Sequence, residues 1–95
     1  MLEARIEDYL SQRVIDAGGM VAKMVPVVAG LPDRLVILPG GVIKLVELKS
    51  PTGRLRPVQV AWHKKAAKRG VRVPVLSSRA EVDQFMKGEG YGSAS

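Results

Sequence analysis

Residues 32–49 read PDRLVILPGGVIKLVELK, a segment with the strongest secondary-structure pattern in the chain. It contains two short runs of mostly aliphatic residues, Arg34 to Leu38 and Val42 to Leu48, which are typical of strands. Pro39-Gly40-Gly41 separates the two runs and supplies the residue types of a tight turn. The stretch therefore predicts a β-hairpin with antiparallel strands over 34–38 and 42–48.

The flanking segments predict the other elements. An amphipathic helix is expected over residues 2–17, because aliphatic residues recur every four positions until Gly18-Gly19. A strand is expected over 20–28, with Pro26 confining part of it to an edge or a bulge. Further along, the pattern predicts a helix over 57–69, a strand over 71–76 and a helix from Ser78 to about residue 87.

This order of elements predicts an α/β fold with a mixed β-sheet flanked by helices. The first three strands can form an antiparallel meander, whereas a helical crossover favours a parallel fourth strand beside the third. The 95 residues are enough for one domain, expected over residues 1–87. The Gly/Ser-rich segment 88–95 is expected to be a flexible tail.

Composition excludes several classes of protein. The chain has no cysteine and one histidine, which excludes disulfides, a cysteine nucleophile and a His-rich metal centre. No apolar run approaches the roughly 20 residues of a membrane span, and no targeting peptide is recognisable. We therefore expect a cytoplasmic protein without a membrane partner.

The distribution of charge indicates a polyanionic partner. The formal net charge is +6, and no acid falls between Glu47 and Glu81. Such an unbalanced basic half is most often a nucleic-acid surface, the alternative being a basic surface with no partner. Nine bases lie in this window: Lys49, Arg54, Arg56, Lys64, Lys65, Lys68, Arg69, Arg72 and Arg79.

Two acids lie where a hairpin would bring them together. Asp33 precedes the first strand and Glu47 lies near the end of the second, so both are expected at the same end of the sheet. Two neighbouring carboxylates repel each other, and a hard cation such as Mg²⁺ or Mn²⁺ removes that cost. Lys49 shares the strand face of Glu47 and could stabilise charge on a phosphate. Alternatively, Asp33 is a turn residue and Glu47–Lys49 a surface ion pair that contributes about 0–1 kcal/mol.

Pro32-Asp33 and Glu47-Leu48-Lys49 together resemble the PD-(D/E)xK nuclease motif, and the expected order matches the restriction-endonuclease-like αβββαβ core of that superfamily. The sequence is most similar to the VRR-NUC family of small, often phage-encoded nucleases, over about residues 3–86. The similarity lies in Gly18-Gly19, Lys23, residues 30–36, residues 38–41, Val46 to Lys49 and Arg56 to Gln59.

The resemblance implies a divalent-metal phosphodiesterase. Asp33, Glu47 and the backbone carbonyl of Leu48 would then hold Mg²⁺ or Mn²⁺, and Lys49 would act in catalysis. A glutamate of the first helix would complete the site; Glu7 fits best, and Glu3 is the alternative.

Other side chains have expected places around this site. The resemblance puts Gln59 near the metal and the substrate phosphate. His63 shares its helix face but is expected to be solvated, Trp62 is expected in the core, and the role of Arg34 stays open. Five bases that follow the second hairpin strand are expected to contact phosphates: Arg54, Arg56, Lys64, Lys65 and Lys68.

The sequence thus predicts a Mg²⁺-dependent DNA endonuclease. The resemblance implies a homodimer that acts on branched DNA such as a four-way junction, since two-fold symmetry suits paired cuts. Two alternatives remain: a non-catalytic basic nucleic-acid-binding module, and a nuclease domain that requires a partner protein.

Overall fold

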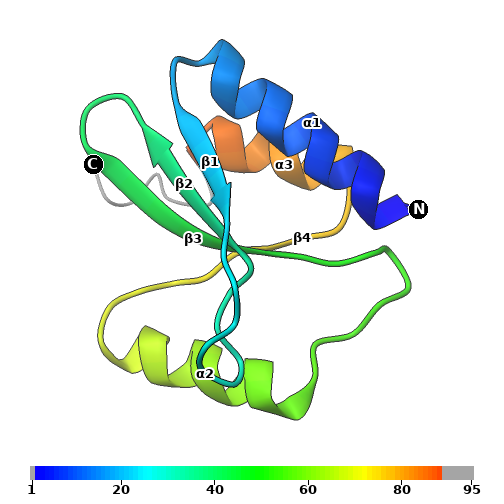
Figure 1. The fold of residues 1–95 in the computed structure, drawn as a ribbon, viewed down its shortest axis with the longest axis vertical. Helices are drawn as coiled ribbons and strands as arrows, with labels where there is room; N and C mark the ends of the chain where they lie inside the picture. Colours follow the sequence, from blue (N-terminus) through cyan, green and yellow to red (C-terminus); the bar gives the residue numbers. More distant parts are fainter. Residues whose placement is uncertain (1, 89–95) are drawn as a thin grey trace.

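The computed structural model describes residues 2–88. A four-stranded sheet in the order β1-β2-β3-β4 is combined with three helices (Figure 1). The first three strands pair antiparallel, and β4 pairs parallel to β3, as predicted. In chain order the elements are α1 (Leu2–Asp16), β1 (Met20–Lys23), β2 (Arg34–Leu38), β3 (Val42–Leu48), α2 (Pro57–Lys68), β4 (Val75–Leu76) and α3 (Arg79–Met86).

The β2–β3 hairpin forms with the predicted limits. Arg34 lies opposite Val46, and Leu38 lies opposite Val42. The turn residues Gly40 and Gly41 have φ angles of 88° and 78°, a left-handed conformation at two successive positions that glycine adopts without a steric penalty.

Two strands are shorter than predicted. The strand expected over 20–28 ends at Lys23, because the chain leaves the sheet before Pro26, which cannot donate a ladder hydrogen bond. The strand expected over 71–76 is reduced to Val75–Leu76, directly after Pro74. Of the tail expected over 88–95, residues 89–95 lie outside the described residues.

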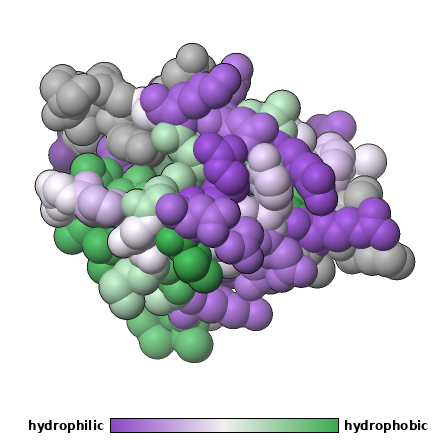
Figure 2. Space-filling view, turned by 90° about the horizontal axis from the view of Figure 1, so that it is seen from above, coloured by the Kyte–Doolittle hydropathy of each residue, from purple (hydrophilic) through white to green (hydrophobic). Residues whose placement is uncertain are grey.

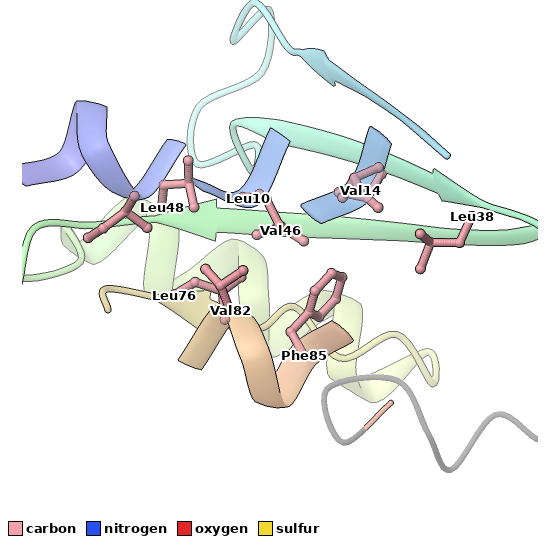
Figure 3. Close-up of a cluster of buried hydrophobic side chains, with 10 residues drawn as sticks. Leu10, Val14, Leu38, Val46, Leu48, Leu76, Val82 and Phe85 are labelled. Carbon is pink, nitrogen blue, oxygen red and sulfur yellow. The ribbon is translucent and has the colours of Figure 1, made fainter. Parts of the chain in front are cut away.

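The hydrophobic core lies on one face of the sheet, under α1 and α3 (Figure 3). Alternate residues of β2 and β3 point into it, as the two-residue strand period requires. The hydroxyl of Tyr9 on α1 also donates a hydrogen bond of 2.6 Å to Asp83 on α3. The buried core residues are Ile6, Leu10, Val14, Val36, Leu38, Val46, Leu48, Leu76, Val82 and Phe85.

Helix α2 lies on the opposite face of the sheet, away from α1 and α3 (Figure 1). Gln59 is the only buried residue of this helix, all of which is described. Near its N-terminal end, the backbone of Val58 closely approaches Gly30, where a side chain would collide with the Val58 carbonyl. A polar residue and a glycine therefore position α2, rather than an apolar core.

The surface is divided between hydrophobic and hydrophilic regions. Figure 2 shows hydrophobic residues gathered at the lower left and hydrophilic residues across the centre and right of the face seen from above. The exposed large hydrophobic residues include Met20 at the edge strand and Val25, Val27 and Val28 in the segment that follows it. Within the part of the chain that the structure describes, no helix has both the length and the apolar character of a membrane span.

Candidate active site

The hairpin brings Asp33 and Glu47 to the same end of the sheet. Arg34 pairs with Val46 in the antiparallel hairpin. Asp33, one residue before Arg34, therefore lies opposite Glu47, one residue after Val46. The side-chain oxygen Oδ1 of Asp33 accepts a hydrogen bond of 3.2 Å from the backbone N–H of Leu48. The two predicted acids thus lie side by side, Glu47 on β3 and Asp33 directly before β2, as the hairpin pattern predicted.

Glu47 is a buried carboxylate with side-chain donors from α2. The residue is 1% exposed, and its backbone N–H donates to the carbonyl of Pro74 across the parallel pair. Gln59 Nε2 donates to Glu47 Oε2 at 3.2 Å, and His63 Nε2 lies 3.3 Å from Glu47 Oε1. A buried charge is costly unless it is hydrogen-bonded, so these contacts are needed to keep the carboxylate in place.

His63 contacts Glu47 because it lies one helical turn after Gln59, on the same face of α2. Its side chain is 14% exposed, so the prediction of a solvated histidine is wrong. Burial lowers the pKa of His63, which favours the neutral imidazole. Since an ionised carboxylate only accepts, a neutral His63 ring can hydrogen-bond to it only in the tautomer with the proton on Nε2. The spacing from Gln59 was the sequence signal for this contact.

Gln59 is held in one orientation by its position at the start of α2. Its Oε1 accepts a hydrogen bond of 2.7 Å from the backbone N–H of Arg56, the residue that precedes the helix. Because the carbonyl end of the amide is occupied in this way, the NH₂ end faces Glu47. Gln59 therefore reaches the predicted site, and the helix cap determines which atoms it presents there.

Arg34, whose role the sequence left open, is buried and links two acids. Its NH2 nitrogen lies 2.6 Å from Glu7 Oε2, and its NH1 nitrogen donates to the backbone carbonyl of Asp33 at 2.8 Å. Glu7 is thus tied to the Asp33 backbone through a guanidinium. Among the side chains that the structure describes, no three acids or histidines form a cluster able to hold a metal, and the side chain of Glu3 is not among them. The role of Glu7 as a ligand stays a prediction.

The remaining predicted residues surround this centre. Lys49 directly follows β3, is half-buried, and its backbone N–H donates to the carbonyl of Leu76 at 3.0 Å. The five expected phosphate contacts are all solvent-exposed, in the segment before α2 and on α2 itself: Arg54, Arg56, Lys64, Lys65 and Lys68. Trp62 is half-buried and does not belong to the core, contrary to the prediction.

Comparison with known proteins identifies the family. The model of the VRR-NUC domain matches residues 10–80, which is most of the chain. The chain belongs to the VRR-NUC family. "Putative nuclease p44" of Acyrthosiphon pisum secondary endosymbiont phage 1 is 41% identical over 78 residues, which cover 81% of this chain and 84% of that protein. A solved structure described as a VRR_NUC domain is 37% identical, with a TM-score of 0.82 over 92% of this chain and 96% of that one.

Family membership makes this VRR-NUC chain a nuclease domain with the fold of its solved relative. The donor atoms near the hairpin end also suit a hard divalent cation. Carboxylate oxygens of Asp33 and Glu47 and a backbone carbonyl are the ligands that Mg²⁺ and Mn²⁺ prefer, and Mg²⁺ usually needs only one or two protein carboxylates beside its waters. Metal binding at these residues stays a prediction.

Proposed function

We propose that this VRR-NUC chain is a divalent-metal-dependent endonuclease that hydrolyses DNA phosphodiester bonds. The observation that carries the proposal is that Asp33, directly before β2, lies opposite Glu47 on β3, with Lys49 two residues beyond Glu47. The exposed bases Arg54 and Arg56 lie between this strand and α2, where a phosphate backbone would have to pass.

The proposed metal ligands are Asp33, Glu47 and the Leu48 carbonyl, with Glu7 as a further candidate. Mg²⁺ or Mn²⁺ bound there would supply an activated water and neutralise charge on the phosphate. Lys49 would stabilise the charge that develops on the phosphate in the transition state. Gln59 and His63 would act as positioning residues that hold the Glu47 carboxylate.

The substrate that we propose is branched DNA, cut by a homodimer. A two-fold dimer presents two equivalent sites, which matches paired cuts across a four-way junction. The similarity to a phage protein named as a putative nuclease supports a nuclease activity, and we propose that it acts on DNA in the cytoplasm of a phage-infected bacterial cell. Both statements extend beyond family membership and need their own tests.

Cleavage of labelled single-stranded, duplex, flap and four-way DNA, with Mg²⁺, Mn²⁺ or EDTA, tests the proposal directly. We expect cleavage only with a divalent cation, and the highest rate on the four-way substrate. Binding without cleavage under every metal condition would favour the basic binding module or a nuclease that needs a partner. Sedimentation velocity would report whether the active species is a dimer.

A further inference from the structure

An apolar pocket of about 340 Å³ lies beside α2, on the face of the sheet opposite the core. The volume is at the lower end of the range for small-molecule sites, about 300–1,000 Å³. Its walls come from β3, α2 and the segment after α2, namely Leu45, Trp62, Lys65, Ala66, Arg69 and Val71.

The pocket adjoins the candidate active site through both of the elements that build it. Leu45 precedes Glu47 by two residues on the same face of β3, a separation of roughly 6–7 Å along a strand. Trp62 precedes His63, whose ring contacts Glu47. The pocket and the carboxylates therefore lie along the same strand and the same helix.

The chemistry of the pocket suits a flat apolar ring attached to a negatively charged chain. Leu45, Ala66 and Val71 are aliphatic, and the indole of Trp62 offers a flat aromatic surface. Two cations, Lys65 and Arg69, also line it, and Arg69 NH1 donates to the Lys65 carbonyl at 2.9 Å. A second copy of the chain, itself charged +6, would be a poor electrostatic match for this pocket.

We propose that this pocket receives a single nucleobase displaced from the DNA duplex, stacked on Trp62, with Lys65 and Arg69 beside its phosphates. The inference rests on the proposed action on DNA and specifies which DNA is preferred. A paired base is confined to its stack, whereas a base at a junction, flap or bulge leaves it at a smaller energetic cost. The pocket would thus give selectivity for distorted DNA without reading sequence.

Base occupancy can be measured without cleavage, in EDTA. Trp62 is the only tryptophan of the chain, so quenching of its fluorescence reports stacking directly. The probes are a paired duplex, the same duplex with a one-adenine bulge, and the same bulge with an abasic nucleotide. We expect the adenine bulge to quench Trp62 and to bind roughly 5- to 150-fold more tightly than the abasic bulge, the range of base–aromatic stacking.

A matched pair of variants tests the location. Ala66→Leu fills the pocket, whereas Ala67→Leu makes the same change at the adjacent exposed position of α2. We expect Ala66→Leu to bring the adenine-to-abasic affinity ratio close to one, with Ala67→Leu unchanged. Trp62→Ala should also remove the preference and Trp62→Phe should retain it, with folding checked by circular dichroism.

Three results would overturn the proposal. One is equal affinity of the unsubstituted chain for the adenine and abasic bulges. Another is an unchanged ratio in folded Ala66→Leu. The third is conversion of a dimer to a monomer by Ala66→Leu but not by Ala67→Leu, which would make the pocket a contact between copies. If the unsubstituted chain cleaves DNA but shows no base preference, this inference alone is contradicted. If it shows the preference but never cleaves, only the proposed nuclease activity is contradicted.

Discussion

Replacing Gly30 by alanine should move α2 without disturbing the hydrophobic core. Gly30 has a φ of 88°, and a Cβ there would lie 2.8 Å from the carbonyl carbon of Val58 and 3.0 Å from the Cβ of Trp62. Side chains do not approach a backbone this closely, so α2 would have to move away from the sheet. The hydrophobic core, on the other face, does not contain α2 residues.

Gly40 provides the matched control, because it has the same φ of 88° but nothing within 4 Å of an added Cβ. Gly40→Ala should therefore lower the free energy of unfolding only by the cost of the left-handed conformation, about 1–2 kcal/mol. Gly30→Ala should lower the free energy of unfolding by the same amount and by roughly 1–3 kcal/mol more, because the added Cβ is overpacked against α2. Urea denaturation of both variants measures the difference.

The two variants should differ more in activity than in stability. A shift of α2 carries Gln59 and His63 away from Glu47, and a displacement of about 1 Å near a catalytic centre can cost about 100-fold in rate. We therefore expect the rate of junction cleavage to fall by about 100-fold in Gly30→Ala and to stay unchanged in Gly40→Ala. Equal unfolding free energies and equal rates in the two variants would refute the argument that Gly30 positions α2.

Other substitutions test the individual roles. Asp33→Asn and Glu47→Gln should each abolish cleavage while circular dichroism shows an intact fold; a rate like that of the unsubstituted chain in either would remove that residue from the site. Lys49→Ala should lose activity but keep metal affinity by calorimetry, whereas a parallel loss of both would indicate a structural role. Alanine at both Arg54 and Arg56 should weaken binding to all sequences alike and flatten the salt dependence of log K by about one unit per lost phosphate contact; an unchanged slope would exclude them from the interface.

The hairpin was predictable because its signals are local. The Pro-Gly-Gly turn and the two-residue alternation of β2 and β3 determine the register within one short stretch. That register sets Asp33 opposite Glu47, so the part of the site on the sheet followed from the sequence. The same alternation separates Glu47 from Val46 and Leu48, which are buried on the core face.

The contacts of α2 were less predictable, because they depend on how far the helix stands from the sheet. The helical period placed His63 on the face of Gln59, but did not reveal that this face meets a buried carboxylate. The ion pair of Arg34 with Glu7 likewise joins elements far apart in the sequence. Strand lengths were overestimated at β1 and β4, since Val-rich segments suit a strand only where a partner edge is present.

One face of the sheet carries the hydrophobic core, and the other carries the candidate active site. Each fully buried apolar side chain of the core face contributes about 1.5–3 kcal/mol, so the packing of α1 and α3 on the sheet accounts for most of the apolar stabilisation. Across the sheet, α2 is joined to Glu47 by hydrogen bonds whose net contribution is only about 1 kcal/mol each. An α2 that is weakly attached by apolar contacts leaves Trp62 beside an open pocket. Packing this face as tightly as the other would stabilise the chain and close the pocket, so the incomplete packing of α2 is what makes room for the proposed substrate.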